Sequence, residues 1–251
     1  MHKFFAKPHF LGKKVIYLSH CHSTNETAAA LLKEKPQIEG TTVITNHQTN
    51  GKGQRGSTWE SEAGKNATFS VILKPSMVAA NQQFQLHLIT TLAIHAALFP
   101  FLGKKLKIKW PNDIYYGDRK LGGILIENSL KGHAIEASIV GIGLNVNQKT
   151  FNEPKAISLT EIVGDEFEVN ELIEQILIQL EKTYLVLRSG DMKKLKSQYL
   201  RRLYRYMSKA NYEIPGRTVK GTIVGVTDSG HLQLKEDEVT HEFDFKEVSY
   251  R

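Results

Sequence analysis

The segment GKGQRGSTW, residues 51–59, combines glycines with positive charge and an aromatic ring. Closely spaced glycines let a backbone take positive φ and approach a ligand, and successive N–H groups in such a loop can bind an anion. Lys52 and Arg55 add cations, and Trp59 offers a flat face for stacking on a ring. The segment therefore favours a ligand that carries a phosphate and a ring, although a solvated connector would have a similar composition.

A second polar group follows an apolar run at KWPND, residues 109–113. Its proline ends the strand ladder, so we expect Asn112 and Asp113 to project from a strand end, where sites are often built. Trp110 is predicted to pack in the core. Lys120 stands seven residues beyond Asp113, just before two glycines inside an apolar strand, which cost stability unless something must come close. This spacing places Lys120 at the mouth of a ligand site, while a solvated hairpin lysine is the simpler alternative.

A third feature is GIGLN, residues 141–145, where glycines alternate through an apolar strand. The amide of Asn145 can both donate and accept, so it could bind a ring edge or a ribose. An asparagine that merely ends a strand is an equally good explanation. Each of the three features, taken singly, has such a structural explanation.

The elements around these features alternate without a strict strand–helix repeat. The patterns predict strands at 13–20, 41–47, 67–74, 106–110, 113–116, 120–127 and 134–146, and helices at 23–35, 81–97, 169–188 and 191–206. Ser23 and Glu26 match a capping box, and Asn81 is a candidate helix cap. The central hairpins require antiparallel pairing, so we expect an α+β fold with a mixed β-sheet flanked by helices.

The C-terminal region changes character, because short strands with glycine turns follow residue 212. They predict a small β-barrel, which divides the chain into a catalytic domain at 1–210 and a barrel domain at 211–251. Phosphate-binding loops of the G-x-x-x-x-G-K-[ST] type and a G-x-G-x-x-G helix start are both missing from the sequence. A nucleotide would have to be held in another way.

Composition limits the classes of protein. The 251 residues carry a formal charge of +7 and one cysteine, which excludes an internal disulfide and fits a reducing cytoplasm. We find no apolar run near the roughly 20 residues that span a bilayer, and no signal peptide pattern. Seven cations without a carboxylate occupy 193–209, where three tyrosines interleave. This could bind nucleic acid, but its spacing favours an amphipathic helix with buried tyrosines and solvated cations.

In combination these motifs resemble those of biotin–protein ligases. The matching segments, in the family's order and rough spacing, are Ser23-Thr24-Asn25, the 51–59 loop, KWPND, DRKLGGILIE (118–127) and GIGLNVN (141–147). The C-terminal GTIVGVTDSGHLQL is similar to that family's small barrel. The resemblance covers about residues 13–251, and KWPND followed by RKLGGILIE is highly specific. The chain begins at the catalytic domain without a helix-turn-helix, so it resembles the monofunctional, cytoplasmic members.

The resemblance implies a class II aminoacyl-tRNA synthetase/biotin ligase-like fold with an SH3-like barrel. It implies an enzyme that converts biotin and ATP, with Mg²⁺, to biotinyl-5′-AMP and transfers biotin to a lysine of a biotin carboxyl carrier protein. Such carriers are often acidic, so a positive enzyme would meet them faster. Neither nucleic acid nor a membrane is expected as a partner, and a homodimer is compatible with the family.

The resemblance also assigns residues. It places biotin against Ser23, Thr24, Asn25, Gln48, Gly51, Lys52, Gly53, Gln54 and Lys120, and the adenylate against Lys52, Arg55, Trp59, Asn112, Lys120 and Asn145. Lys120 would bridge the biotin carboxylate and the α-phosphate, and Asp113 would steer or deprotonate the acceptor lysine. Metal ligands stay unassigned.

The sequence departs from the family pattern at Gln54, where many members have an arginine that holds the adenylate. Glutamine cannot reproduce the planar fork of arginine, so Arg55 is expected to supply the charge and is the third catalytic candidate. Three other functions stay open: a lipoate ligase or octanoyl transferase, a nucleic-acid-binding protein, and a non-catalytic biotin-binding module.

Overall fold

The structure is a computed structural model that describes residues 8–251, apart from the side chain of Arg55. The first seven residues, which belong to the segment searched for a signal peptide, lie outside the described part.

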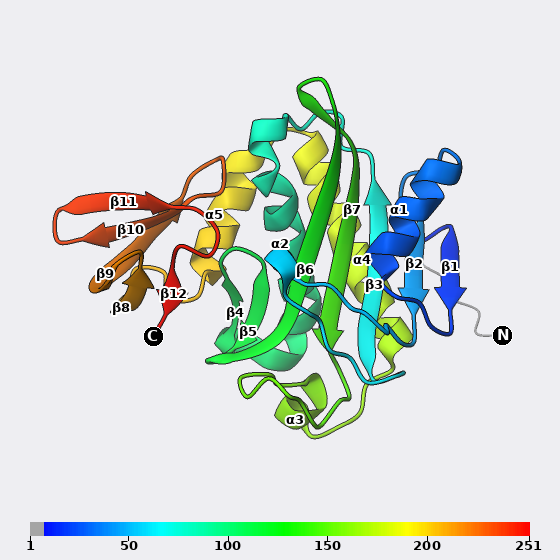
Figure 1. The fold of residues 1–251 in the computed structure, drawn as a ribbon, viewed down its shortest axis with the longest axis horizontal. Helices are drawn as coiled ribbons and strands as arrows, with labels where there is room; N and C mark the ends of the chain where they lie inside the picture. Colours follow the sequence, from blue (N-terminus) through cyan, green and yellow to red (C-terminus); the bar gives the residue numbers. More distant parts are fainter. Residues whose placement is uncertain (1–7) are drawn as a thin grey trace.

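A seven-stranded sheet forms the centre of the larger part of the molecule (Figure 1). Its strands, in spatial order, are β1 (Val15–Leu18), β2 (Thr42–Thr45), β3 (Asn66–Leu73), β7 (Ala134–Asn145), β6 (Arg119–Lys131), β5 (Asp113–Tyr116) and β4 (Leu106–Lys109). β1 and β2 pair in parallel and every other neighbouring pair is antiparallel. The predicted mixed sheet is therefore confirmed.

The two faces of this sheet differ because successive side chains of a strand point to opposite sides. All eight residues of β3 are buried. Its apolar residues Phe69, Val71 and Leu73 belong to the main core with helices α2 (Phe84–Leu102) and α4 (Val169–Arg188). Its polar residues Thr68 and Ser70 alternate with them and therefore face the other side.

Helix α1 (Thr24–Glu34) covers only part of that other side. Its Ala28 packs with Val43, Ile72 and Ile139, and these residues form a separate small core. The helix contacts β2, β3 and β7. At its N-terminal end, the Asn25 side chain of α1 donates to Leu125 and Glu127 of β6. Beyond this contact, a cavity opens on the same face over β4, β5 and β6.

The start of α1 differs from the prediction. Ser23 is the N-cap, but its side chain makes no capping bond, and Glu26 instead pairs with Lys52. Gln48 accepts from the Thr24 backbone N–H at 2.8 Å, so a distant side chain satisfies this helix end.

A capping box does form between Ser158 and Glu161, at a short helix α3 (Leu159–Val163) that the patterns did not predict. The two matches to one motif therefore differ in outcome, because at α1 Lys52 takes the Glu26 carboxylate and Gln48 accepts from the first N–H of the helix.

Helix α2 is apolar on all sides. Asn81 lies in a 3₁₀ turn (Ala80–Gln82) and Gln83 is the N-cap, so the prediction of Asn81 as the cap was wrong. The stretch Ala80–Lys105 is long and apolar enough to cross a membrane by length and composition alone, which the sequence reading missed. Most of its apolar part is buried within the protein, as expected for a core helix.

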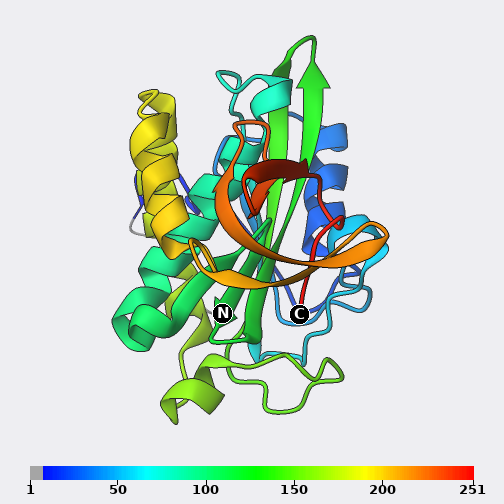
Figure 2. The same ribbon diagram turned by 90° about the vertical axis from the view of Figure 1, so that its left-hand side faces the viewer.

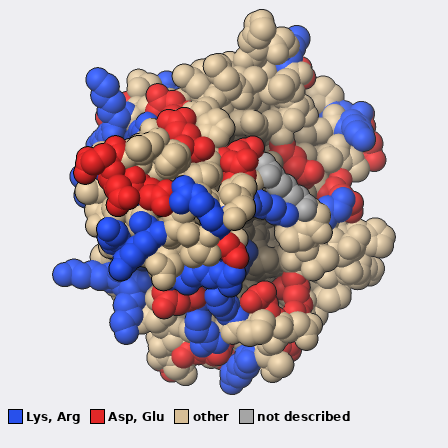
Figure 3. Space-filling view, turned by 60° about the vertical axis from the view of Figure 1, so that its left-hand side comes forward, with Lys and Arg blue, Asp and Glu red and all other residues tan. Residues whose placement is uncertain are grey.

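Helix α5 (Met192–Arg202) ends four residues before the predicted end. Leu195 and Tyr199 are buried, which confirms the amphipathic interpretation of this helix. Figure 3 shows many Lys and Arg side chains on the left and lower parts of one face of the molecule. Of the three tyrosines that could have stacked on bases, Tyr199 and Tyr204 are buried and Tyr206 is half-buried.

The second sheet has five strands in the order β11, β10, β9, β8, β12 and is antiparallel, an SH3-like arrangement (Figure 2). Its strands are β8 (Lys209–Ile214), β9 (Arg217–Val226), β10 (Leu232–Glu236), β11 (Val239–Phe243) and β12 (Ser249–Tyr250). Trp110 joins the two parts, because it is 3% exposed and its Nε1 donates to the Gly230 carbonyl at 2.8 Å. Its ring also meets Phe245 edge-on.

Candidate active site

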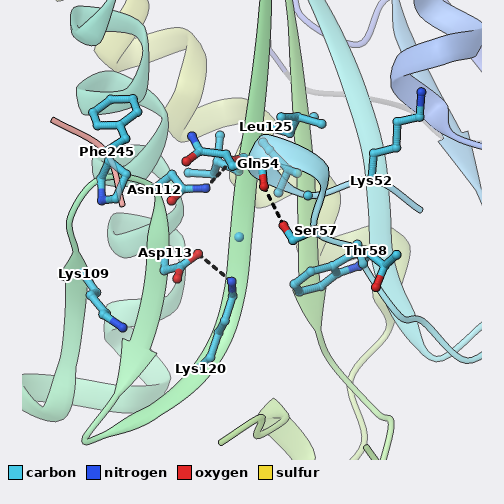
Figure 4. A pocket seen from close by; sticks show the side chains of 18 of the residues that line it. Lys52, Gln54, Ser57, Thr58, Lys109, Asn112, Asp113, Lys120, Leu125 and Phe245 are labelled. Atoms are coloured by element: carbon cyan, nitrogen blue, oxygen red, sulfur yellow. Dashed lines mark hydrogen bonds and ion pairs between the residues drawn. The ribbon is translucent and has the colours of Figure 1, made fainter. Parts of the chain in front are cut away.

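A cavity of about 650 Å³ opens on the sheet and is lined by residues of all three motifs. Figure 4 shows part of its lining. Its lining includes these predicted site residues: Ser23, Thr24, Asn25, Gln48, Lys52, Gly53, Gln54, Trp59, Asn112, Asp113 and Lys120. The third motif contributes Gly141 and Gly143. Segments more than a hundred residues apart therefore share one site.

One row of paired residues crosses the floor of the cavity. Lys109 pairs with Asp113, Asp113 with Gly123, Gly123 with Gly143, and Gly143 with Thr68. Directly paired residues of antiparallel strands project to the same face of a sheet. All five residues line the cavity, and the two central glycines leave its floor without side chains.

A β-bulge directs Lys120 into this cavity. Ile114 pairs with Gly122 but Tyr115 pairs with Lys120, so Leu121 is an extra residue on β6. In a regular strand Lys120 and Gly123, three residues apart, would project to opposite faces of the sheet, because side chains alternate. The bulge brings Lys120 to the same face as Gly123. A Cβ built at Gly123 would lie 3.5 Å from the Lys120 Nζ, so Lys120 reaches over the glycine floor.

Lys120 and Asp113 form the charged centre of the site. Their Nζ and Oδ1 atoms are 2.7 Å apart, and the side chains are 30% and 18% exposed (Figure 4). The Lys120 ammonium also lies 5.9 Å from the centroid of the Trp59 ring. Asp113 is the only carboxylate among the described residues that line the cavity.

Asn145 does not line the cavity. Its Nδ2 donates to the Ile157 carbonyl at 3.1 Å, and Ile157 N–H donates to the Lys120 carbonyl at 2.9 Å. On the other side, Lys120 N–H donates to the Lys155 carbonyl at 2.6 Å. The structure therefore places Asn145 behind the segment that holds the Lys120 backbone, and does not support its predicted contact with adenosine.

The glycines of the 51–59 loop serve close packing more than unusual backbone angles. Of the three in GKGQRG, only Gly56 has a positive φ, of 82°. A Cβ on Gly51 would come within 2.3 Å of the Trp59 carbonyl, and one on Gly53 within 2.4 Å of Ser57 Oγ. The positive φ that the glycines permit is therefore used at Gly56, while Gly51 and Gly53 permit close approach. Gly51 is buried and is not one of the residues that line the cavity.

The polar side chains of this loop point to different partners. Lys52 bonds Glu26 of α1 at 2.5 Å, which raises the pKa of Lys52 and directs its ammonium toward that helix. Gln54 lies 3.4 Å from His87 Nε2. Burial lowers the pKa of His87 to about 4, so this histidine is neutral near pH 7. The side chain of Arg55 lies outside the described part.

At the α1 end of the cavity, uncharged side chains that line it hydrogen-bond one another and are held from behind by a carboxylate outside the lining. Ser70 Oγ lies 2.7 Å from Thr24 Oγ1 and 2.6 Å from Asn25 Oδ1. The Asn25 Nδ2 donates to Glu127 at 2.7 Å, so both ends of this amide are fixed. A Cβ on Gly141 would come within 2.3 Å of Asn25 Oδ1. The glycine is therefore required for this orientation of Asn25.

Trp59 and Asn112 have different surroundings. A Cβ on Gly143 would lie 2.5 Å from the Trp59 ring, so this glycine makes room for the indole. The Trp59 Nε1 is buried and has no hydrogen-bond partner in the described part of the chain. Asn112 is 9% exposed and donates to the Ile124 carbonyl at 2.7 Å, which ties the KWPND turn to β6.

The sequence reading missed several lining residues. They are Ser57, Thr58, Thr68, Lys109 and Leu125, together with Phe245, Lys246, Val248, Ser249 and Tyr250 from the C-terminal sheet. The alternation of Lys107, Ile108 and Lys109, which runs into KWPND, could have indicated Lys109. The C-terminal residues had no local signal, because only the packing of the second sheet brings them to the cavity.

A protein-built metal site is not found. Among residues 8–251 with described side chains, no group of three His, Cys, Asp or Glu could hold a metal ion. Among the described lining residues the cavity offers one carboxylate, Asp113, which is paired with Lys120.

Comparison with family models gives two matches. Residues 17–145 match the biotin/lipoate A/B protein ligase family, and residues 209–251 match the biotin protein ligase C-terminal domain. The first match contains the lining residues from Ser23 to Gly143, and the second contains those from Phe245 to Tyr250. The chain belongs to the biotin/lipoate A/B protein ligase family.

Individual proteins agree with this assignment. The chain is 30% identical over 245 residues to the bifunctional ligase/repressor BirA of Bacillus subtilis (strain 168), covering 94% of this chain and 74% of that protein. It is 29% identical to the biotin–[acetyl-CoA-carboxylase] ligase of Mycobacterium tuberculosis, covering 84% and 79%. A solved structure of the biotin protein ligase from Aquifex aeolicus with biotin and ATP superposes with a TM-score of 0.79, at 28% identity, covering 95% and 99%.

Proposed function

We propose that this chain is a ligase that activates biotin with ATP to biotinyl-5′-AMP and transfers the biotinyl group to a lysine of a biotin carboxyl carrier protein. One observation carries the proposal: a single cavity joins the neutral network of α1 to the Lys120–Asp113 pair. The relatives named as biotin ligases, and the match of 209–251 to the biotin protein ligase C-terminal domain, support it.

The α1 end suits the ureido ring of biotin. That ring has two N–H donors and one carbonyl acceptor, and it carries no charge. Thr24 and Asn25 are buried and already held by Ser70, so their polar atoms are fixed before a ligand arrives. Preorganised hydrogen-bonding groups bind without further ordering cost, which supports the proposed biotin contacts at Ser23, Thr24, Asn25 and Gln48.

The charged centre suits the adenylation step. A biotin carboxylate oxygen attacks the α-phosphorus of ATP, and the bond from that phosphorus to the α,β-bridging oxygen breaks. Two anions must come together, so a cation between them lowers the barrier. Lys120 is proposed for this position, and the unpartnered Trp59 Nε1 supports a ligand acceptor beside it.

The transfer step needs a neutral lysine amine, whose pKa is about 10.4 in water. Asp113 is proposed to accept its proton. In the described structure Asp113 pairs with Lys120, so we expect the carboxylate to become available when Lys120 turns to the adenylate. The amine then attacks the biotinyl carbonyl carbon, and AMP leaves.

We propose that Mg²⁺ takes part with ATP, as the resemblance implies. The described residues offer no cluster of ligands for it, so the phosphates would supply most of its oxygens. Residues 1–210 are proposed as the catalytic unit and 211–251 as the barrel unit, in a cytoplasmic enzyme that acts without nucleic acid or a membrane and is able to dimerise.

The direct test is incubation with ATP, Mg²⁺, biotin and a carrier domain, followed by mass measurement of the carrier. A mass increase equal to one biotinyl group, accompanied by pyrophosphate release, is expected. Thermal stabilisation by biotin but not by lipoate would separate the proposal from a lipoate ligase. An unmodified carrier with no biotin-dependent pyrophosphate would refute it.

A further inference from the structure

Lys109 lies at the end of the cavity farthest from α1 along the paired row. It is the last residue of β4 and lines the same cavity as Lys120. Its Nζ donates to the Tyr115 hydroxyl at 3.0 Å and lies 4.6 Å from the centroid of that ring. The Tyr250 ring of β12 lies 4.9 Å from the same Nζ. The large sheet and the C-terminal sheet thus hold one lysine between them.

These contacts hold the ammonium without neutralising it. An aromatic face attracts a cation through its quadrupole but carries no net charge. Within the described residues, Lys109 makes no ion pair with a carboxylate, and its pairing partner Asp113 bonds Lys120 instead. The charge of Lys109 is therefore available to a ligand.

Other cations surround the same place. Burial lowers the pKa of Lys109, and the charges of Lys120, Lys155 and Arg205 lower it further, while Asp113 raises it. Lys155 is exposed, so solvent screens its contribution. Cations outnumber carboxylates around Lys109, and this repulsion would become attraction if a ligand with several negative charges entered.

We propose that Lys109 binds the β- and γ-phosphates of ATP and then the leaving pyrophosphate, as a further substrate-binding residue of this site. The inference rests on the proposed function. Its position follows from the paired row, in which Asp113 lies between Lys109 and the glycine floor below Lys120. β4 lies two strands from β6, about 10 Å away, and Lys120 already reaches across to Asp113 on the strand between them. Outer phosphates that extend from Lys120 over β5 would therefore come to Lys109.

This position also fits the electron flow of adenylation. When the α-phosphorus bond to the bridging oxygen breaks, the electron pair stays on that oxygen and pyrophosphate gains negative charge. A lysine at the outer phosphates stabilises this charge more than it stabilises bound ATP. Lys120 cannot serve both places, because it is proposed between the carboxylate and the α-phosphate.

The test measures each half of the reaction in Lys109→Met and Lys109→Arg. For Lys109→Met we expect the KM for ATP in biotin-dependent pyrophosphate release, and the inhibition constant of inorganic pyrophosphate, to rise about ten- to a hundredfold, as for one lost charged hydrogen bond. Transfer from purified biotinyl-5′-AMP to the carrier should fall much less, because neither ATP nor pyrophosphate takes part in that half of the reaction. Lys109→Arg should recover part of the ATP affinity, because it keeps the charge.

Lys105→Met is the matched control. Lys105 also lies over a tyrosine, with its Nζ 5.9 Å from the Tyr116 ring, but it lies outside the cavity lining. Equal effects of the two Met variants, unchanged ATP and pyrophosphate constants in Lys109→Met, or an equal loss in the transfer half would each overturn the inference. An inactive wild-type protein would instead refute the proposed function.

Discussion

The two ends of the cavity are built on opposite principles. At α1, neutral groups satisfy one another: Ser70 bonds Thr24 and Asn25, and Gln48 bonds the Thr24 backbone. At β4 and β5, cations exceed carboxylates and part of the charge is left without an ionic partner. A neutral ring needs directional contacts that are fixed in advance. A polyphosphate needs excess positive charge, and in the site without a ligand these cations repel one another.

The largest expected effect on activity comes from removing Lys120, the cation between the two ends of the cavity. Lys120→Ala should slow biotin-dependent pyrophosphate release by about 10²- to 10³-fold, since the two anions would meet without a charge between them. Lys105→Met should behave as the wild type in the same assay. Pyrophosphate release at the wild-type rate by Lys120→Ala would contradict the assigned role.

Substitutions at two glycines of β7 can distinguish the two ends of the cavity, because Gly141 contacts Asn25 and Gly143 contacts Trp59. Gly141→Ala should displace Asn25 and raise the KM for biotin about ten- to a hundredfold, because the added Cβ would occupy the position of the amide oxygen. Gly143→Ala should displace Trp59 and act mainly on the KM for ATP. Each variant is the control for the other. If both changed the same constant, the division into two ends would fail.

The helix behind the charged end gives a pH dependence. Burial lowers the pKa values of His87 and His95 on α2 to about 4. In unfolded chains they would be near 6.5, so between pH 6.5 and 4 the unfolded state binds more protons and the folded state loses stability as the pH falls. Each histidine should remove up to about 3 kcal/mol of unfolding free energy across this range.

The measurement is urea denaturation at pH 7 and pH 5 for the wild type, His95→Gln and His87→Gln. Each substitution should lower the pH slope of the unfolding free energy, even where it lowers the stability itself. Slopes identical to that of the wild type would show that these histidines titrate while folded.

The smallest effect is expected at the loop. Gln54→Arg should slow escape of biotinyl-5′-AMP and reduce labelling of bystander lysines several-fold, because arginine adds a charged, planar donor beside the adenylate. Gln54→Asn shortens the side chain without adding charge and serves as the control. Equal bystander labelling by wild type and Gln54→Arg would argue against a retention role for this position.

Much of this architecture was predictable from short patterns. The apolar alternation indicated the strands, the glycine turns indicated the hairpins, and the motifs indicated many of the residues that line the cavity. The capping box at Ser23 was wrong for a reason outside the motif, since Lys52 takes Glu26 and Gln48 caps the helix. Asn145 looked like a ligand contact, but its amide is bonded to Ile157.

The sequence by itself determined which side chains could do chemistry and on which elements they lie, because periodicity and turn residues act over a few positions. Only the tertiary structure decided which face each of them reaches. The extra residue Leu121 turns Lys120 into the cavity, and the C-terminal sheet brings Tyr250 to Lys109. Both depend on pairing and packing between distant segments, and local patterns do not encode the register of a bulge or the docking of one sheet on another.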